Sequence, residues 1–237
     1  MEEIYQRTEL LIGEDGIRKL RNASVLVVGL GGVGAYCCEN LSRAGIGKMT
    51  LVDGDIINPS NFNRQLIATR TNLGKLKAEV LAKRIEDINP KIQLNIISSY
   101  IKEDEMQGLL KKDKFNFVVD AIDTLSPKVS LIYNCVQLSI PIASSMGSGG
   151  RVDPQKVKID DISRSFNCPL AFKVRKLLHR KGVFSGVSVV YSSEKVDKLS
   201  VIKEEGQNKK STVGTISYMP AIFGCFLSSI VIRELIK

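Results

Sequence analysis

Short apolar runs alternate with amphipathic stretches through residues 23–146. Runs of strand length, rich in β-branched and large aliphatic residues, lie at 24–28, 48–52, 92–97, 115–119 and 140–144. Between them, apolar residues recur at helical spacing over 33–43, 74–88, 103–111 and 125–138. This alternation is typical of parallel strands joined by right-handed helical crossovers. The sequence therefore predicts an α/β fold with a doubly wound, mostly parallel sheet.

The pattern changes on both sides of this region. Residues 1–22 predict a helical arm made of one or two short helices. Beyond Gly147, antiparallel strands are predicted at 157–162 and 186–191, a basic helix at 169–180 and a C-terminal helix at 220–235. Residues 195–211 are polar and without periodicity, which predicts a mobile loop. We expect one domain over 1–237: the arm at 1–22, a core at 23–146 and a C-terminal antiparallel extension at 147–237.

Composition restricts the class of protein. Of the 237 residues, 43% are hydrophobic and 25% charged, as in ordinary soluble globular proteins. No run reaches the roughly 18 uncharged apolar residues of a membrane span, and the start, Met1-Glu2-Glu3-Ile4, lacks the apolar segment of a signal peptide. The five cysteines form no Cys-x-x-Cys pair, and there is one histidine. We therefore expect a cytoplasmic protein with no membrane contact and no zinc.

Positive charge is concentrated in one segment. The net charge is +9, and residues 151–182 contain nine Lys or Arg against three Asp. Within the predicted helix at 169–180, Lys173, Lys176 and Arg180 share one face. Such a face attracts polyanions such as RNA, but charge alone is better explained by a solvated, lysine-rich surface.

A glycine-rich turn joins the first predicted strand to its helix. Residues 29–34 read Gly-Leu-Gly-Gly-Val-Gly, and Asp53-Gly54-Asp55 ends the second strand. Backbone N–H groups in such a turn can approach a phosphate, and an acid about twenty residues later is placed to hold a ribose hydroxyl. The sequence therefore predicts that residues 23–146 form a nucleotide-binding core. The phosphates would lie at Gly29, Gly31, Gly32 and Gly34, and the ribose at Asp53 with Asp55 beside it.

Further polar residues favour ATP over NAD as the expected nucleotide. Asn61-Phe62-Asn63-Arg64-Gln65 follows the second strand, and Gly74-Lys75-Leu76-Lys77 opens a helix at its positive end. Arg64 and Lys77 would neutralise β- and γ-phosphates, a need that bound NAD does not have. Asp120 and Asp123 follow the fourth strand, where the ligands of such sheets bind, and either could hold Mg²⁺. We favour Asp123, because Asp120 could instead cap the next turn.

This ordered set of motifs resembles the ATP site of the ubiquitin-activating-like, ThiF-type superfamily, whose members adenylate carboxylates. The resemblance implies a Rossmann-like ThiF fold. It also implies that Asn61, Arg64 and Lys77 grip the triphosphate, that Gln65 belongs to the same ATP site, and that Asp123 binds magnesium. Arg7 matches an arginine that reaches the ATP of the partner subunit, which implies a homodimer. The expected catalytic residues are then Arg7, Arg64, Lys77 and Asp123.

Motifs outside the ATP site narrow this resemblance. Segments at 7–16, 146–154, 168–178 and 189–194 look like those of the tRNA threonylcarbamoyladenosine dehydratases. That family implies ATP-dependent cyclisation of threonylcarbamoyladenosine in tRNA next to the anticodon. Residues 147–237 would then face the tRNA, with Lys173, Lys176 and Arg180 binding it. Cys168 stands where the family usually has Asp. Members can also bind a monovalent cation, Na⁺ or K⁺, for which the sequence indicates no residue.

Other functions remain open at this level. An enzyme that adenylates a ubiquitin-like sulfur carrier would share the ATP site, but such enzymes typically carry paired Cys-x-x-Cys motifs. An NAD-dependent oxidoreductase would share the glycine turn without needing Arg64 or Lys77. A catalytically silent nucleotide-binding scaffold would not need the complete set of phosphate-directed residues.

Overall fold

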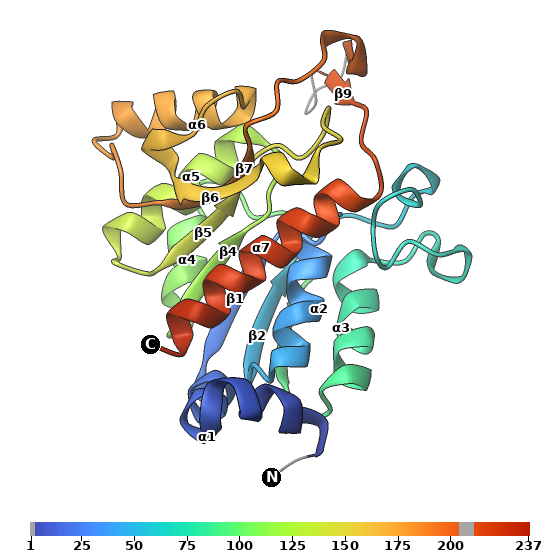
Figure 1. Cartoon of the computed structure of the whole chain (residues 1–237), viewed down its shortest axis with the longest axis vertical. Coiled ribbons are helices and arrows are strands. Elements are labelled where there is room, and N and C mark those ends of the chain that lie inside the picture. Colours follow the sequence, from blue (N-terminus) through green and yellow to red (C-terminus); the bar gives the residue numbers. More distant parts are fainter. Residues whose placement is uncertain (1–2, 204–210) are drawn as a thin grey trace.

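A computed structural model of the chain describes residues 3–203 and 211–237 (Figure 1). Seven strands form one sheet in the order β3-β2-β1-β4-β5-β7-β6. They span Ser24–Val28 (β1), Lys48–Val52 (β2), Gln93–Ile97 (β3), Phe117–Asp120 (β4), Ile142–Ser145 (β5), Val157–Asp161 (β6) and Ser188–Ser192 (β7). Neighbours from β3 to β7 are parallel, and the edge strand β6 is antiparallel to β7. The predicted fold class is confirmed, and the C-terminal strands extend the same sheet.

Helices cover both faces of this sheet. On one face lie α2 (Gly34–Ala44), α3 (Lys77–Ile88) and α7 (Tyr218–Leu235), and on the other α4 (Met106–Lys111), α5 (Leu125–Gln137) and α6 (Pro169–Arg180) (Figure 1). The helix α1 (Gln6–Asn22) crosses the end where β1 begins. Every residue of β1 is buried, because Val25 and Val27 enter the core with α2 and α7 while Leu26 and Val28 enter the core with α5.

The structure differs from the sequence expectation in the segment before α3. The helix was expected from residue 74 but begins at Lys77. Gly74 has φ 78°, the N–H of Ile57 donates to the carbonyl of Lys75, and Leu76 forms a β-bridge with Ile56. Because residues 75 and 76 are paired in this way, the helix begins only at Lys77, which lies in its first turn.

The segment 195–211 was expected to be an irregular, mobile loop, and that expectation is wrong in part. Strand β8 (Val201–Lys203) pairs antiparallel with β9 (Ser211–Val213) after a 3₁₀ turn at Lys198–Ser200. β-Branched residues at 201, 202, 212 and 213 favour this short hairpin in spite of the polar surroundings. Residues 204–210 lie outside the described residues.

The C-terminal helix α7 is mostly apolar, with a charged pair, Arg233 and Glu234, in its last turn. By length and composition alone it could cross a bilayer, but 44% of it is buried inside the structure. Phe223, Leu227 and Val231 enter the core shared with α2. At Gly224 a Cβ would lie 2.5 Å from the carbonyl oxygen of Val33, so only glycine permits this close approach to α2. The helix therefore has its packing partner within the fold.

Glu39 ties α2 to α3, which gives a prediction about stability. Its Oε1 accepts a 2.7 Å hydrogen bond from Arg43, and its Oε2 accepts one of 2.8 Å from Arg84. Burial favours the neutral acid, but these hydrogen bonds outweigh it and lower the pKa of Glu39. We expect Glu39→Gln to lower the free energy of unfolding at pH 7 by about 1 kcal/mol.

The pH dependence provides the check. Because the folded pKa is lowered, this stabilisation is present above the unfolded pKa of about 4.3 and is lost as pH falls through the folded value. The difference between wild type and Glu39→Gln, measured by urea denaturation, should therefore shrink steadily as the pH is lowered below the unfolded pKa. A difference that stays the same across this acid range would contradict the assignment.

Candidate nucleotide site

The glycine turn at residues 29–34 is closed by two positions where only glycine fits. Gly29 has φ 90°, and its N–H donates to the carbonyl of Val52 over 2.9 Å. A Cβ at Gly29 would lie 2.6 Å from the carbonyl oxygen of Ala121, and a Cβ at Gly34 only 1.8 Å from the carbonyl oxygen of Gly29. The turn is thus pressed against the segment after β4, and α2 begins at the carboxyl edge of the sheet.

Asp53 fastens the end of β2 to this turn. Its Oδ2 accepts a 2.6 Å hydrogen bond from the N–H of Leu30, and its Oδ1 accepts one of 2.8 Å from the N–H of Asp55. Burial raises the pKa of Asp53, and these two backbone donors oppose that effect. Each oxygen keeps lone-pair capacity for a further donor such as a hydroxyl. Sequence reasoning predicted the ribose role but not this second role in shaping the turn.

Lys77 lies beside Asp53 and is held by Asp55. The Lys77 side chain is only 5% exposed, and its Nζ is 2.7 Å from Asp55 Oδ2. The hydroxyl of Tyr100 donates to the other oxygen of Asp55, which raises the pKa of Tyr100 to about 12. Tyr100 follows β3 and was not predicted as a site residue. Its position after a parallel strand, at the same edge of the sheet, is the signal that could have found it.

The loop after β2 reaches the open side of the glycine turn. Gln65 Nε2 lies 3.6 Å from where a Cβ of Gly31 would be. The carbonyl oxygen of Arg64 lies 3.4 Å from where a Cβ of Gly32 would be. Gln65 Oε1 is buried and accepts no hydrogen bond from the described residues. An unused buried acceptor next to a half-buried glycine turn fits a polar ligand.

Two predicted phosphate ligands are engaged within their own turn. Asn61 Oδ1 accepts from the N–H of Asn58, and Arg64 Nη1 donates to the carbonyl of Ser60 at 2.9 Å and to Asn63 Oδ1 at 2.8 Å. Asn61 is buried, whereas Arg64 is partly exposed. Its guanidinium has five donors, so these bonds leave others for an anion.

The two acids after β4 differ in their surroundings. Asp120 is fully buried; its Oδ2 accepts from Lys128 Nζ at 2.6 Å and from Ser144 Oγ at 2.5 Å. Its Oδ1 accepts from the N–H of Ile122. Asp120 therefore stabilises the fold, while Asp123 is exposed and its charge contributes to the raised pKa of Tyr100. Within residues 3–203 and 211–237, no three His, Cys, Asp or Glu side chains form a group that could hold a metal.

Arg7 lies far from these residues. Tyr5 packs its ring against Gly45, which ends α2, since a Cβ at Gly45 would be 3.1 Å from that ring. The glycine turn is at the other end of α2, about 16 Å away along the helix. Within one chain, α1 and the glycine turn therefore lie at opposite ends of the strands (Figure 1). Lys173, Lys176 and Arg180 are exposed on α6, as predicted, and also lie outside this site.

Comparison with known protein families decides the classification of this fold. The ThiF family matches residues 5–237, which is nearly the whole chain. The chain belongs to the ThiF family. The ThiF match includes the C-terminal extension as well as the nucleotide-binding core, so both parts of the chain are explained by one family.

Among its ThiF relatives, the tRNA threonylcarbamoyladenosine dehydratase of Bacillus subtilis is 34% identical over 98% of this chain and 94% of the relative. The dehydratase of Escherichia coli is 37% identical over 79% of this chain and 72% of the relative. The sulfur carrier protein ThiS adenylyltransferase of E. coli is 32% identical, but over 62% of this chain and 60% of the relative.

Solved structures give the same grouping. The E. coli tRNA N6-threonylcarbamoyladenosine dehydratase, TcdA, in complex with ATP matches with a TM-score of 0.89 at 32% identity, covering 98% of this chain and 93% of that one. The same protein in complex with AMP matches with a TM-score of 0.87. The ThiF fold of this chain thus follows that of a nucleotide-binding relative from end to end.

Proposed function

We propose that this chain is an ATP-dependent tRNA threonylcarbamoyladenosine dehydratase. The observation that carries the proposal is a glycine turn surrounded by Asp53, Lys77 and Arg64, in a chain similar over nearly its full length to dehydratases of that name. A tRNA substrate agrees with the cytoplasmic location expected from the sequence. The shorter similarity to the ThiS adenylyltransferase favours this function over activation of a sulfur carrier.

The proposed reaction activates a poor electrophile. A carboxylate oxygen of the threonyl group attacks the α-phosphorus of ATP, pyrophosphate leaves, and an acyl-adenylate forms. The neighbouring carbamoyl group then loses a proton as it closes the ring, and AMP leaves, so that one water is lost overall. Arg64 and Lys77 neutralise the charge that develops on the leaving pyrophosphate. Ring closure is intramolecular and gains from proximity, so no protein nucleophile is needed.

Mg²⁺ fits Asp123 in this proposal. Magnesium commonly uses one or two carboxylates together with phosphate oxygens and water. Asp123 is exposed at the carboxyl edge, whereas both oxygens of Asp120 already accept hydrogen bonds. When bound, the ion would offset phosphate charge. A monovalent cation, Na⁺ or K⁺, stays a prediction without assigned residues.

The mass of the modified nucleoside tests the proposed function. The protein is incubated with ATP, Mg²⁺ and tRNA that carries threonylcarbamoyladenosine, and the nucleosides are analysed by mass spectrometry. We expect the modified adenosine to lose one water only when ATP is present. An unchanged mass, under conditions where the B. subtilis relative acts, would overturn the proposal.

Gly31 provides a test of the phosphate position that leaves the fold intact. A Cβ at Gly31 would make only an ordinary 3.6 Å contact with Gln65, so Gly31→Ala should keep the stability of the wild type. It would still cover amides that a phosphate must approach, and we expect the Kd for ATP to rise about ten-fold. Isothermal titration calorimetry measures this. Gly108→Ala in α4, where a Cβ meets nothing within 4 Å, is the matched control. An unchanged Kd in Gly31→Ala would place the phosphates elsewhere.

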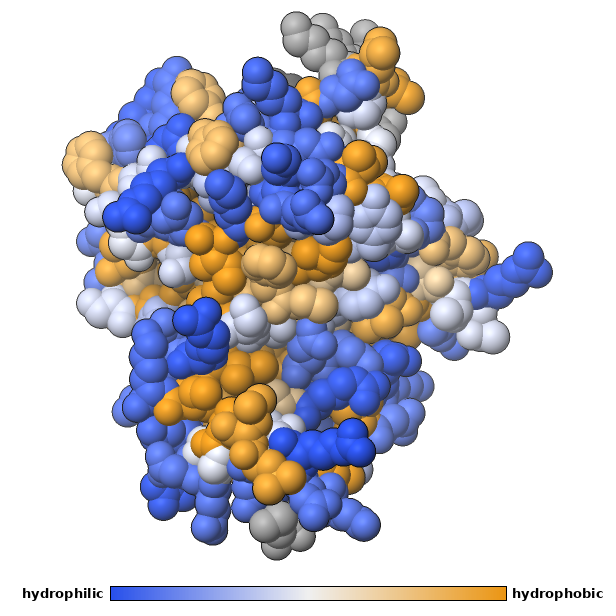
Figure 2. Space-filling view, in the orientation of Figure 1, coloured by the Kyte–Doolittle hydropathy of each residue, from blue (hydrophilic) through white to orange (hydrophobic). Residues whose placement is uncertain are grey.

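We also propose a homodimer formed through α1 and α7. Leu10 and Leu11 on α1 are 84% and 85% exposed. Figure 2 shows apolar side chains along the outer side of α7 and again over α1. Exposed apolar surface of this kind marks an interaction surface, and a twofold-symmetric dimer is the commonest way to cover one. Arg7 is on the same helix, which supports its expected role in the partner's ATP site.

Mixed subunits test the sharing of Arg7. Arg7→Ala and Asp123→Ala should each inactivate a homodimer, because neither assembly contains a complete site. An equal mixture should recover about a quarter of the wild-type activity, since half of the dimers are hybrids with one intact site. Each variant mixed with itself is the control. No recovery, with hybrids detected by native mass spectrometry, would contradict sharing.

A further inference from the structure

The exposed side of α6 carries aromatic rings as well as positive charge. Phe172 is 60% exposed, and Phe184, in the turn after α6, is 62% exposed. Ala171, Val174 and Leu178 on the other side of the helix are buried in the core that α6 shares with α5. The fold therefore does not need the two phenyl rings for its core, and both face outward.

A hollow of about 330 Å³ lies on this outer side. Its lining is a set of side chains at helical spacing, namely Phe172, Arg175, Lys176, His179 and Arg180. Arg175 Nη1 donates to the carbonyl of Ser165 at 2.8 Å and is thereby fixed in place. The His179 and Phe184 rings lie 5.1 Å apart, so Phe184 continues the aromatic surface beyond the hollow. Among the described residues, neither Lys176 nor Arg180 forms an ion pair.

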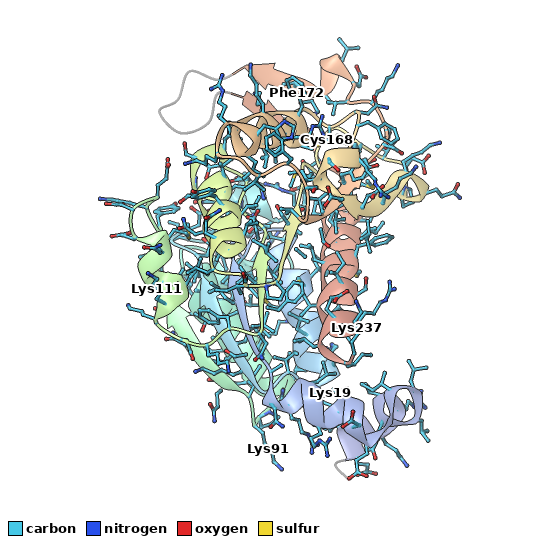
Figure 3. All side chains as sticks on the ribbon, turned by 90° about the vertical axis from the view of Figure 1, so that its left-hand side faces the viewer. Lys19, Lys91, Lys111, Cys168, Phe172 and Lys237 are labelled. Carbon is cyan, nitrogen blue, oxygen red and sulfur yellow. The ribbon has the colours of Figure 1, made fainter. Side chains whose placement is uncertain are left out.

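This hollow lies toward the edge of the sheet that holds the nucleotide site. Gly147 follows β5 at the carboxyl edge, and Cys168 Sγ, just before α6, is 3.9 Å from where a Cβ of Gly147 would be. Phe172 is one turn further along α6, and Figure 3 shows Cys168 and Phe172 at the same end of the molecule. Lys111 on α4 lies well away from them in the same view.

We propose that this hollow binds an unpaired nucleobase of the tRNA loop that carries the modified adenosine, stacked on Phe172. The proposal rests on the proposed function and adds to it a site for a second base. Proteins recognise unpaired loop bases by stacking them on aromatic rings, with cations on the adjoining phosphates. Lys176 and Arg180 supply those cations here. A protein partner is a poorer fit, because lysine is depleted from protein interfaces and Lys176 lines this hollow.

The chain contains no tryptophan, which permits a direct optical test. Phe172→Trp introduces a single emitter in the hollow. Its fluorescence should be quenched by an RNA hairpin with an anticodon-type loop and unaffected by a fully paired RNA duplex. Phe166→Trp is the matched control: Phe166 is 48% exposed but outside the hollow, with its ring against Tyr191 at 5.8 Å. Equal quenching by duplex, or none by the hairpin, would overturn the proposal.

The RNA affinities of single variants distinguish the contribution of base stacking from that of positive charge. Phe172→Ala, and equally Phe172→Leu, should weaken binding of the hairpin about ten-fold without changing its salt dependence. Lys176→Glu should weaken hairpin and duplex alike and flatten the salt dependence, while Lys111→Glu should alter neither. If Phe172→Leu changes the sedimentation of the protein rather than RNA binding, the face is a protein contact and the proposed base site is wrong.

The two proposals can fail separately. Hairpin-selective quenching without any dehydration of the modified adenosine would refute the proposed function and leave the base site standing.

Discussion

Replacing Lys77 by methionine should lower the kcat/KM for ATP consumption by about 10²- to 10³-fold, the usual cost of removing one charge-stabilising group from a reaction site. Methionine keeps an unbranched apolar stem, which suits a side chain that is 5% exposed. It removes the ammonium that, in the proposed reaction, neutralises phosphate charge. Because Lys77 is shielded from water, solvent cannot replace that charge. Pyrophosphate release is the measurement.

Lys75→Met is the matched control for this substitution. Lys75 lies two residues earlier, is exposed, and its Nζ makes a long 3.4 Å contact with Asn72 Oδ1. We expect its kcat/KM to stay within about two-fold of wild type, as for a surface charge. A similar loss in both variants would mean that general positive potential, rather than the position of Lys77, assists the reaction.

Lys128→Met should lower the free energy of unfolding by about 3–5 kcal/mol. Lys128 and Asp120 are both fully buried, with Nζ and Oδ2 2.6 Å apart. Removal of the ammonium leaves a buried carboxylate whose remaining partners, Ser144 and the N–H of Ile122, carry no charge. The loss is measured by urea denaturation at neutral pH.

The double variant Asp120→Asn/Lys128→Met supplies the control. It removes both charges, so most of the lost stability should return. If Lys128→Met alone does not fold, the double variant should still fold. Equal destabilisation of the single and double variants would show that the lysine contributes through packing rather than by neutralising Asp120.

The central strands of the sheet were predictable because they are buried on both faces. In β1 and β4 every position is buried, so the strands appear as unbroken apolar runs. The start of α3 was not predictable from periodicity, because the pairing of residues 56–57 with 75–76 overrides the helical pattern. The β8–β9 hairpin was missed because its strands are only three residues long.

The residues of the candidate site were predictable where they belong to a local motif at a fixed distance from the end of a strand. They were not predictable where they depend on contacts between segments far apart in the sequence. The glycine turn and Asp53 are fixed by their distance from strand ends. Tyr100 was missed, since its contact with Asp55 joins loops after different strands. The partnership of Asp120 with Lys128 likewise depends on how α5 lies over β4, which no local pattern encodes.

The position of α1 has a consequence for how activity varies with the amount of protein. Tyr5 anchors the arm at the end of α2 that is remote from Gly34, so a lone subunit keeps its Arg7 away from its own ATP site. In the homodimer that we propose, Arg7 acts in the partner subunit, so dissociation would silence both subunits at once. Specific activity would then fall on dilution below the dimer Kd, and cellular abundance itself would set the working fraction of the enzyme.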